Sequence, residues 1–120
     1  MKFFSILLIF LFPFFQTTNK VVEWVTVTEF DFGDIEKEEE STYHFQFKNI
    51  TDAPIVIDNV RPDCGCTAPE WGSEPIEPDS IGTIQVTFDA RKKGYFYKKV
   101  KVFFSGQKKA ERLYLEGFVN

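Results

Sequence analysis

Residues 43–48, YHFQFK, decide the fold class, because aromatic and polar side chains alternate along them at every position. Successive side chains of an extended chain point to opposite faces, so the three aromatic residues share one face. His44, Gln46 and Lys48 share the other face, and His44, the single histidine, is interpreted as a solvated residue. The pattern predicts a β-strand that is buried on one side only.

The same period of two residues recurs downstream, in TIQVTF at 83–88 and in YFYKKVKVFF at 95–104. Turn residues separate these segments, and no segment keeps the apolar period of 3.6 that is typical of helices. The chain therefore reads as an all-β domain of about seven short strands, either a sandwich or a barrel. The expected core is Tyr43, Phe45, Phe47, Ile55, Ile57, Ile84, Val86, Phe88, Val100, Val102 and Leu115.

The first residues have the composition of a secretory signal peptide. Lys2 precedes an almost wholly apolar run, residues 3–15, and Thr17, Thr18 and Asn19 follow it. As a helix this run would rise about 20 Å, less than the roughly 30 Å of a bilayer core. We expect residues 1–18 to be a cleaved signal peptide and residues 19–120 to form one exported domain, periplasmic or extracellular, without a permanent membrane span. A retained membrane anchor is the alternative.

Charge and motifs favour a non-catalytic protein. The 120-residue chain has a net charge of −4, and loss of Lys2 leaves 13 basic against 18 acidic residues, a net charge of −5. Such a chain has no broad electrostatic reason to bind nucleic acid. Residues 36–40 hold four glutamates that are interpreted as a solvated loop. No phosphate-binding glycine loop is present, and nothing in the sequence brings His44 close to a cysteine nucleophile.

Cys64-Gly65-Cys66 is the segment with the clearest chemical potential. It lies in residues 61–79, a proline-rich connection that we expect to hold a short extended piece around 64–67. A bridge between the two cysteines would close so short a loop that chain entropy contributes only about 1.6 kcal/mol. Such a bridge is a poor structural link and is better suited to redox exchange.

Three other roles for these cysteines stay open. Two neighbouring thiolates can bind Cu(I), whereas a structural zinc site needs about four ligands. The cysteines can also pair with another chain, or serve only as small packing residues. No cofactor is assigned, with Cu(I) as the one candidate.

A second candidate site lies on the strand expected at 95–104. Tyr95, Tyr97 and Phe103 fall on the face opposite the core, together with Lys99 and Lys101. Exposed aromatic side chains interleaved with cations can form a surface that binds proteins or glycans. The alternative is that a loop covers this face or that it exposes scattered apolar atoms without function.

The chain resembles the bacterial domain-of-unknown-function family 1573 (DUF1573) over nearly all of the mature segment. The shared motifs are F-x-F-G, F-K-N, C-G-C-T-x-P, P-I-x-P, G-x-I-x-V-x-F and G-x-F-x-K. They fall on Phe30 to Gly33, Phe47 to Asn49, Cys64 to Pro69, Pro75 to Pro78, Gly82 to Phe88, and Gly94 to Lys98. The chain departs from the pattern at Asp79, where glycine is commoner, and at Ser105-Gly106, where Ser-Asn is usual.

The resemblance implies an exported immunoglobulin-like sandwich, and it implies no activity. Our leading hypothesis is a non-catalytic binding or structural module of the bacterial cell envelope, with another envelope protein as its partner. The second hypothesis is a thiol-based redox or Cu(I)-binding protein acting through Cys64 and Cys66.

Overall fold

The computed structural model describes Pro13 and residues 19–120, and all regular structure in this part of the chain is β. The expected signal peptide, residues 1–18, lies outside the described residues except for Pro13. Within the described part, no helix is long and apolar enough to cross a membrane.

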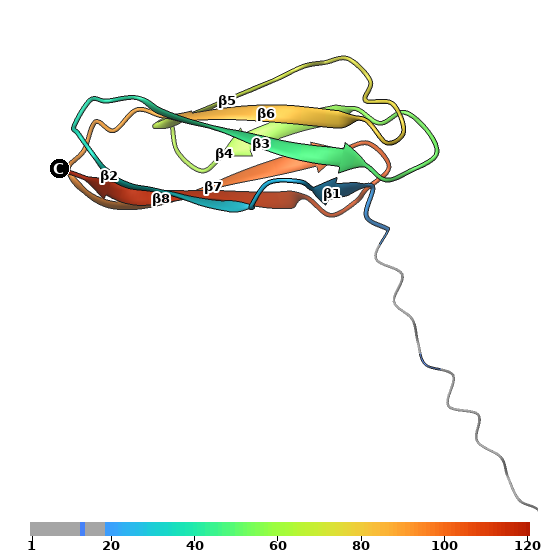
Figure 1. The fold of residues 1–120 in the computed structure, drawn as a ribbon, viewed down its shortest axis with the longest axis horizontal. Helices are drawn as coiled ribbons and strands as arrows, with labels where there is room; N and C mark the ends of the chain where they lie inside the picture. Colours follow the sequence, from blue (N-terminus) through green and yellow to red (C-terminus); the bar gives the residue numbers. More distant parts are fainter. Residues whose placement is uncertain (1–12, 14–18) are drawn as a thin grey trace, which may run out of the picture.

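Eight strands form two four-stranded sheets that pack face to face, which confirms the immunoglobulin-like sandwich. Figure 1 shows the two layers, with β5 and β6 in one and β2 and β8 in the other. One sheet has the order β1-β3-β6-β5 and the other β2-β8-β7-β4. The strands are β1 (Val22–Trp24), β2 (Glu29–Ile35), β3 (Ser41–Asn49), β4 (Ile57–Pro62), β5 (Thr67–Trp71), β6 (Ile81–Phe88), β7 (Gly94–Phe104) and β8 (Glu111–Val119).

The described part of the chain has one strand more than the expected seven because the first apolar run divides between the sheets. Trp24 ends β1, which pairs antiparallel with β3, and Glu29 begins β2, which pairs parallel with β8. Val25 and Val27, in the connection, are each 57% exposed. The alternation of this run is therefore imperfect because the chain leaves one sheet after Trp24 and enters the other at Glu29.

The core lies between the sheets and follows the predicted alternation. Ten of the eleven expected core residues are buried, and Phe45, Phe47, Ile84 and Leu115 have no exposed surface. Tyr43 is the exception: it is half-buried and stacks on Phe30, with ring centroids 3.8 Å apart. It lies near one end of β3, where the layers leave its ring partly open to solvent.

Asn49 holds the loops at the other end of β3 together and is fully buried. Its Nδ2 donates to the carbonyls of Ala53 and Ile76, both at 2.9 Å, and its Oδ1 accepts the N–H of Thr51 at 2.9 Å. Every polar group of this side chain is thereby paired, as burial requires. The F-K-N motif thus ends in a residue that connects two loops.

The two departures from the family pattern fall on turn residues with positive φ. Asp79 has φ of 63° and Gly106 has φ of 79°. Glycine adopts this region without penalty, and Asn or Asp is the next most tolerant residue. The family alternatives at these positions, glycine and asparagine, therefore satisfy the same backbone requirement.

Candidate functional site

The cysteines lie in the connection that crosses from one sheet to the other, as the sequence predicts. Pro62 ends β4 in one sheet, and Thr67 begins β5 in the other. The extended piece expected around residues 64–67 lies later in the chain: it is β5, residues 67–71, and residues 64–66 form the turn before it. Pro69 is tolerated because β5 is an edge strand, where a missing amide donor interrupts no second partner.

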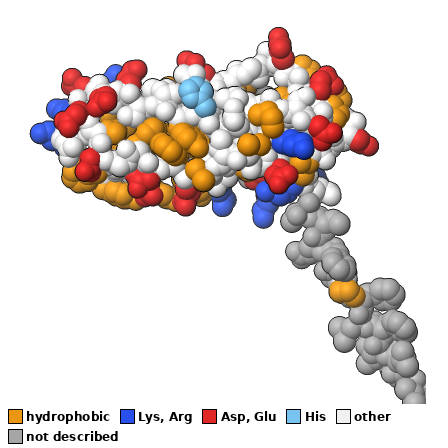
Figure 2. Space-filling model, viewed as in Figure 1, with side chains coloured by type: hydrophobic (Ala, Val, Ile, Leu, Met, Phe, Trp, Pro, Cys, Tyr) orange, Lys and Arg blue, Asp and Glu red, His pale blue; other side chains and the backbone are white. Residues whose placement is uncertain are grey.

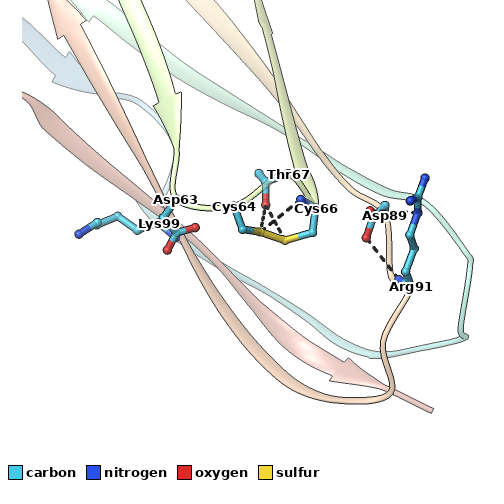
Figure 3. Close-up of a disulfide and its surroundings, with 7 residues drawn as sticks. All are labelled: Asp63, Cys64, Cys66, Thr67, Asp89, Arg91 and Lys99. Atoms are coloured by element: carbon cyan, nitrogen blue, oxygen red, sulfur yellow. Dashed lines mark hydrogen bonds and ion pairs between the residues drawn. A yellow bond between two sulfur atoms is a disulfide. The ribbon is translucent and has the colours of Figure 1, made fainter.

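Hydrogen bonds fix both ends of this turn independently of the disulfide bond. Figure 3 shows Asp63 and Lys99 at one end of the turn and Asp89 beyond the other end. Asp63 exchanges two bonds with Lys99 of β7: its N–H donates to the Lys99 carbonyl at 3.0 Å, and its carboxylate accepts the Lys99 N–H at 3.2 Å. On the other side the Asp89 N–H donates to the Cys66 carbonyl at 3.0 Å. The crossing is therefore attached to both sheets by backbone contacts.

Cys64 and Cys66 form a disulfide, with their Cα atoms 5.4 Å apart. The Cys66 N–H donates to Cys64 Sγ at 3.3 Å, and Thr67 Oγ1 lies 3.9 Å from Cys64 Sγ and 3.7 Å from Cys66 Sγ. Both cysteines are half-buried. The bond encloses only the intervening Gly65, so it joins no two strands, and it is placed at a partly accessible position.

A groove of about 440 Å³ opens beside the disulfide and is rich in cations. We call it the disulfide groove; its lining is Cys64, Cys66, Phe88, Asp89, Arg91, Lys92, Lys93, Tyr95, Phe96 and Lys98. Arg91 pairs with Asp89 at 3.3 Å, which leaves the three lysines without an acidic partner among the described lining residues. An acidic protein thus carries a locally positive site next to its sulfur atoms.

Lys98 is a groove residue that the sequence analysis missed. It alternates with the buried residues Phe96 and Val100 on β7, so its position has the parity of the core, yet its side chain is half-exposed. A lysine ammonium is rarely buried without a partner, because desolvation is costly. The signal in the sequence is therefore a cation at a core-parity position, which indicates an opening in the sandwich.

The described residues place no further metal ligand beside the two cysteines. His44 is exposed on β3, opposite Gln85 of β6. Within the described residues, no group of three or more His, Cys, Asp or Glu side chains is arranged to hold a metal ion. As a disulfide the two sulfurs offer no thiolate, so a Cu(I) site would first require reduction.

The glutamate-rich loop, residues 36–40, is exposed as expected.

The second candidate site, on β7, divides into two parts. Lys101 and Phe103 line a separate hollow of about 920 Å³ that also contacts Trp24. Phe103 is half-buried, with the Arg61 guanidinium 5.4 Å from its ring centroid. Lys99 lies between this hollow and the tyrosines. The five predicted residues share one outer face, but they do not form one continuous aromatic surface.

Tyr95 and Tyr97 belong to a larger aromatic cluster completed by β8. We call this the tyrosine face: Tyr95, Tyr97, Tyr114 and Phe118. Tyr95 lies opposite Phe118 in the β7–β8 register, and the Tyr97 and Tyr114 rings stack with centroids 5.1 Å apart. In Figure 2 hydrophobic side chains gather along the edge that β2 and β8 occupy in Figure 1. Sequence reasoning missed the β8 residues because only the register brings them to this face.

Carboxylates hold the tyrosine hydroxyls in place. Tyr95 donates to Glu116 Oε2 at 2.9 Å, and Tyr97 donates to Glu29. The hydrogen bond to Glu116 raises the pKa of Tyr95, and the bond to Glu29 raises the pKa of Tyr97 from 10.0 to about 12, because both stabilise the neutral phenol. The rings are thereby oriented before any partner arrives.

Comparison with known proteins gives a family and a fold. The family model described as "Protein of unknown function (DUF1573)" matches residues 23–119. A search of curated proteins finds no match. Among solved structures, the ASH/PapD-like domain 7 of human CEP192 is similar with a TM-score of 0.72 and 16% identity, covering 90% of this chain and 91% of that one.

Two bacterial structures share the fold over part of their length. A protein of unknown function from Porphyromonas gingivalis has a TM-score of 0.69 and 14% identity, over 85% of this chain. This chain covers about half of it, 49%. The CupB2 chaperone of Pseudomonas aeruginosa has a TM-score of 0.55 and 9% identity, over 72% of this chain and 52% of that one. At these identities the likeness concerns the fold alone.

Proposed function

This chain belongs to the DUF1573 family, and from that premise we propose that it is an exported, non-catalytic module that binds another protein of the bacterial cell envelope through its tyrosine face. The observation that carries the proposal is the clustering of large apolar side chains in solvent. Tyr95 is 67% exposed, and Tyr97 and Phe118 are each 45% exposed, on adjacent strands of one sheet. Exposed aromatic clusters of this kind are favoured at the centres of protein interfaces.

The fixed orientation of the tyrosine rings also supports a role in protein binding. Tyrosine has few rotatable bonds, and the hydrogen bonds to Glu29 and Glu116 restrict both rings further. The conformational entropy that binding removes is therefore partly lost already in the free protein. One of the proteins that share this fold is a chaperone, and this supports another protein as the binding partner.

Lys99 lies opposite Tyr114, but carboxylates outnumber cations around the tyrosine face and favour a basic partner. Asp31 of β2 lies directly opposite Glu116 of β8, and like charges at such positions repel each other. Glu29 adds a third carboxylate near Tyr97. A partner that brings apolar side chains together with lysine or arginine would cover the rings and relieve this repulsion.

Site-specific photocrosslinking in intact cells tests the binding proposal. A photoreactive residue at position 95 is expected to give one dominant protein adduct, while the same residue at Gln85, on the outer face of the other sheet, gives none. With the captured partner purified, the Tyr95→Ser/Phe118→Ser double variant should weaken binding about thirtyfold or more, the scale of a 2 kcal/mol interface residue. Equal adducts at both positions, or unchanged affinity, would refute the proposal.

Export is tested separately by fractionation. The full chain is expected in the periplasm or medium, shortened near residue 18 by mass spectrometry, and the chain starting at residue 19 is expected in the cytoplasm. A full-length mass in the membrane fraction would instead support the retained anchor.

A further inference from the structure

We propose that the Cys64–Cys66 disulfide is a redox-active bond that exchanges with small anionic thiols, which reach it through the disulfide groove. This inference goes beyond the binding role of the tyrosine face and does not depend on it. The ligand class is a thiol that carries a carboxylate or sulfonate group.

The bond is free to react because the fold does not depend on it. Both ends of the turn are anchored by other contacts: Asp63 bonds to β7, and the Cys66 carbonyl accepts the Asp89 N–H. The disulfide itself spans two positions in sequence and joins no strands. Opening it therefore leaves both sheets attached to the crossing.

The charge of the groove selects an anion. Lys92, Lys93 and Lys98 line it without an acidic partner among the described lining residues, and the Asp89 carboxylate is already paired with Arg91. The chain as a whole carries a net charge of −4, so this positive patch contrasts with its surroundings. A charged cleft raises the local concentration of oppositely charged ligands and their rate of encounter.

Thr67 Oγ1 lies near both sulfurs, so the backbone hydrogen bond to Cys64 is the contact that gives the two cysteines different roles. Cys64 Sγ accepts the Cys66 N–H at 3.3 Å, so a thiolate formed on Cys64 would be stabilised at once. A sulfur whose thiolate is stabilised is the better leaving group in exchange. The external thiolate therefore attacks Cys66 Sγ, and the developing charge is received by Cys64.

The exchange balances as follows. The external thiolate forms a bond to Cys66 Sγ, the Cys64–Cys66 bond breaks, and its electron pair passes to Cys64 Sγ. A second external thiolate attacks the external sulfur of this mixed disulfide and releases the Cys66 thiolate. The protein gains two electrons and is left with two thiolates, while two external thiolates become one external disulfide. In the reverse direction the protein dithiol reduces an anionic disulfide.

A series of thiols that share the 2-mercaptoethyl group tests the proposal on the intact oxidised protein. The probes are 2-mercaptoethanesulfonate (anionic), 2-mercaptoethanol (neutral) and thiocholine (cationic), and the reaction is followed by mass spectrometry after acid quenching. Each rate is expressed per thiolate and divided by the rate of the same thiol with a small neutral disulfide, because intrinsic nucleophilicity varies with thiol pKa. The sulfonate thiol should react roughly tenfold or more faster than thiocholine at low salt, with the neutral thiol between them. Peptide mapping should place the mixed disulfide on Cys66.

Charge-removal variants provide the matched control. Replacing Lys92, Lys93 and Lys98 by glutamine should abolish the order of the three rates, while Lys108→Gln/Lys109→Gln, at the other hollow, should preserve it. Equal rates for all three probes in the unaltered protein would overturn the proposal, as would a mixed disulfide mapped mainly to Cys64. Isolation of the protein from its native compartment with both thiols free and unreactive toward anionic disulfides would overturn it too.

Discussion

Replacing Asn49 by aspartate tests how much the fold depends on one buried side chain. The two residues have nearly the same shape, so the change isolates hydrogen-bond chemistry. The Nδ2 group of Asn49 donates to the carbonyls of Ala53 and Ile76, which can only accept. An ionised carboxylate would place negative oxygen against both carbonyls, and no cation is among the described hydrogen-bond partners of the Asn49 side chain. The aspartate must therefore be protonated in the folded protein.

The cost can be worked from these contacts. Protonating a carboxyl group of ordinary pKa, about 3.9, at pH 7 costs about 4 kcal/mol. The protonated group has one donor where the amide has two, so one hydrogen bond is lost as well, at about 1 kcal/mol. We expect Asn49→Asp to lower the free energy of unfolding by about 5 kcal/mol at pH 7. Its folded-state pKa is raised, so the loss shrinks to about 1–2 kcal/mol as the pH falls to 4.

Denaturant unfolding at both pH values measures this difference, with the unaltered protein as reference at each. Asn59→Asp is the matched control, because Asn59 is half-buried and its Oδ1 only accepts the Val60 N–H, which a carboxylate also accepts. That change should cost less than about 0.5 kcal/mol. A loss below about 1 kcal/mol for Asn49→Asp at pH 7, or a loss that does not depend on pH, would refute the reasoning.

Three further predictions concern packing, the disulfide and the tyrosine face. Gly82→Ala should lower the free energy of unfolding by about 1–3 kcal/mol, because the added methyl would overlap the fully buried ring of Phe47. The control Gly72→Ala adds a methyl with no atom within 4 Å and should be near neutral in thermal unfolding. Replacing both cysteines by serine should cost no more than about 1.6 kcal/mol and keep unfolding cooperative; loss of the folded state would show that the bond holds the sheets. Tyr97 should titrate near pH 12 by ultraviolet absorbance, and Glu29→Gln should bring its pKa back toward 10. Because folding raises this pKa, the stability that the hydrogen bond contributes is complete below pH 10 and is lost as the pH approaches 12. A titration near pH 10 in the unaltered protein would contradict the hydrogen bond.

Much of the candidate chemistry was visible in the sequence, but its surroundings were not. Cys64 and Cys66 were identified from their spacing, and Tyr95 and Tyr97 from their parity on an alternating strand. Nothing local could show that β8 places Phe118 opposite Tyr95. The partial cover of Phe103 by Arg61 depends likewise on the pairing of β4 with β7.

The sequence by itself determined most of the strands and ten of the eleven expected core residues, because alternation is a property of each segment and burial on one face follows from it. It also determined that the cysteines lie on a proline-rich crossing. Only the tertiary structure decided which strands are neighbours, where the first run changes sheet, and that Lys98 and Lys92-Lys93 converge on the disulfide. Register and sheet order arise from contacts between residues far apart in the chain, whose energies depend on the packing of both layers together.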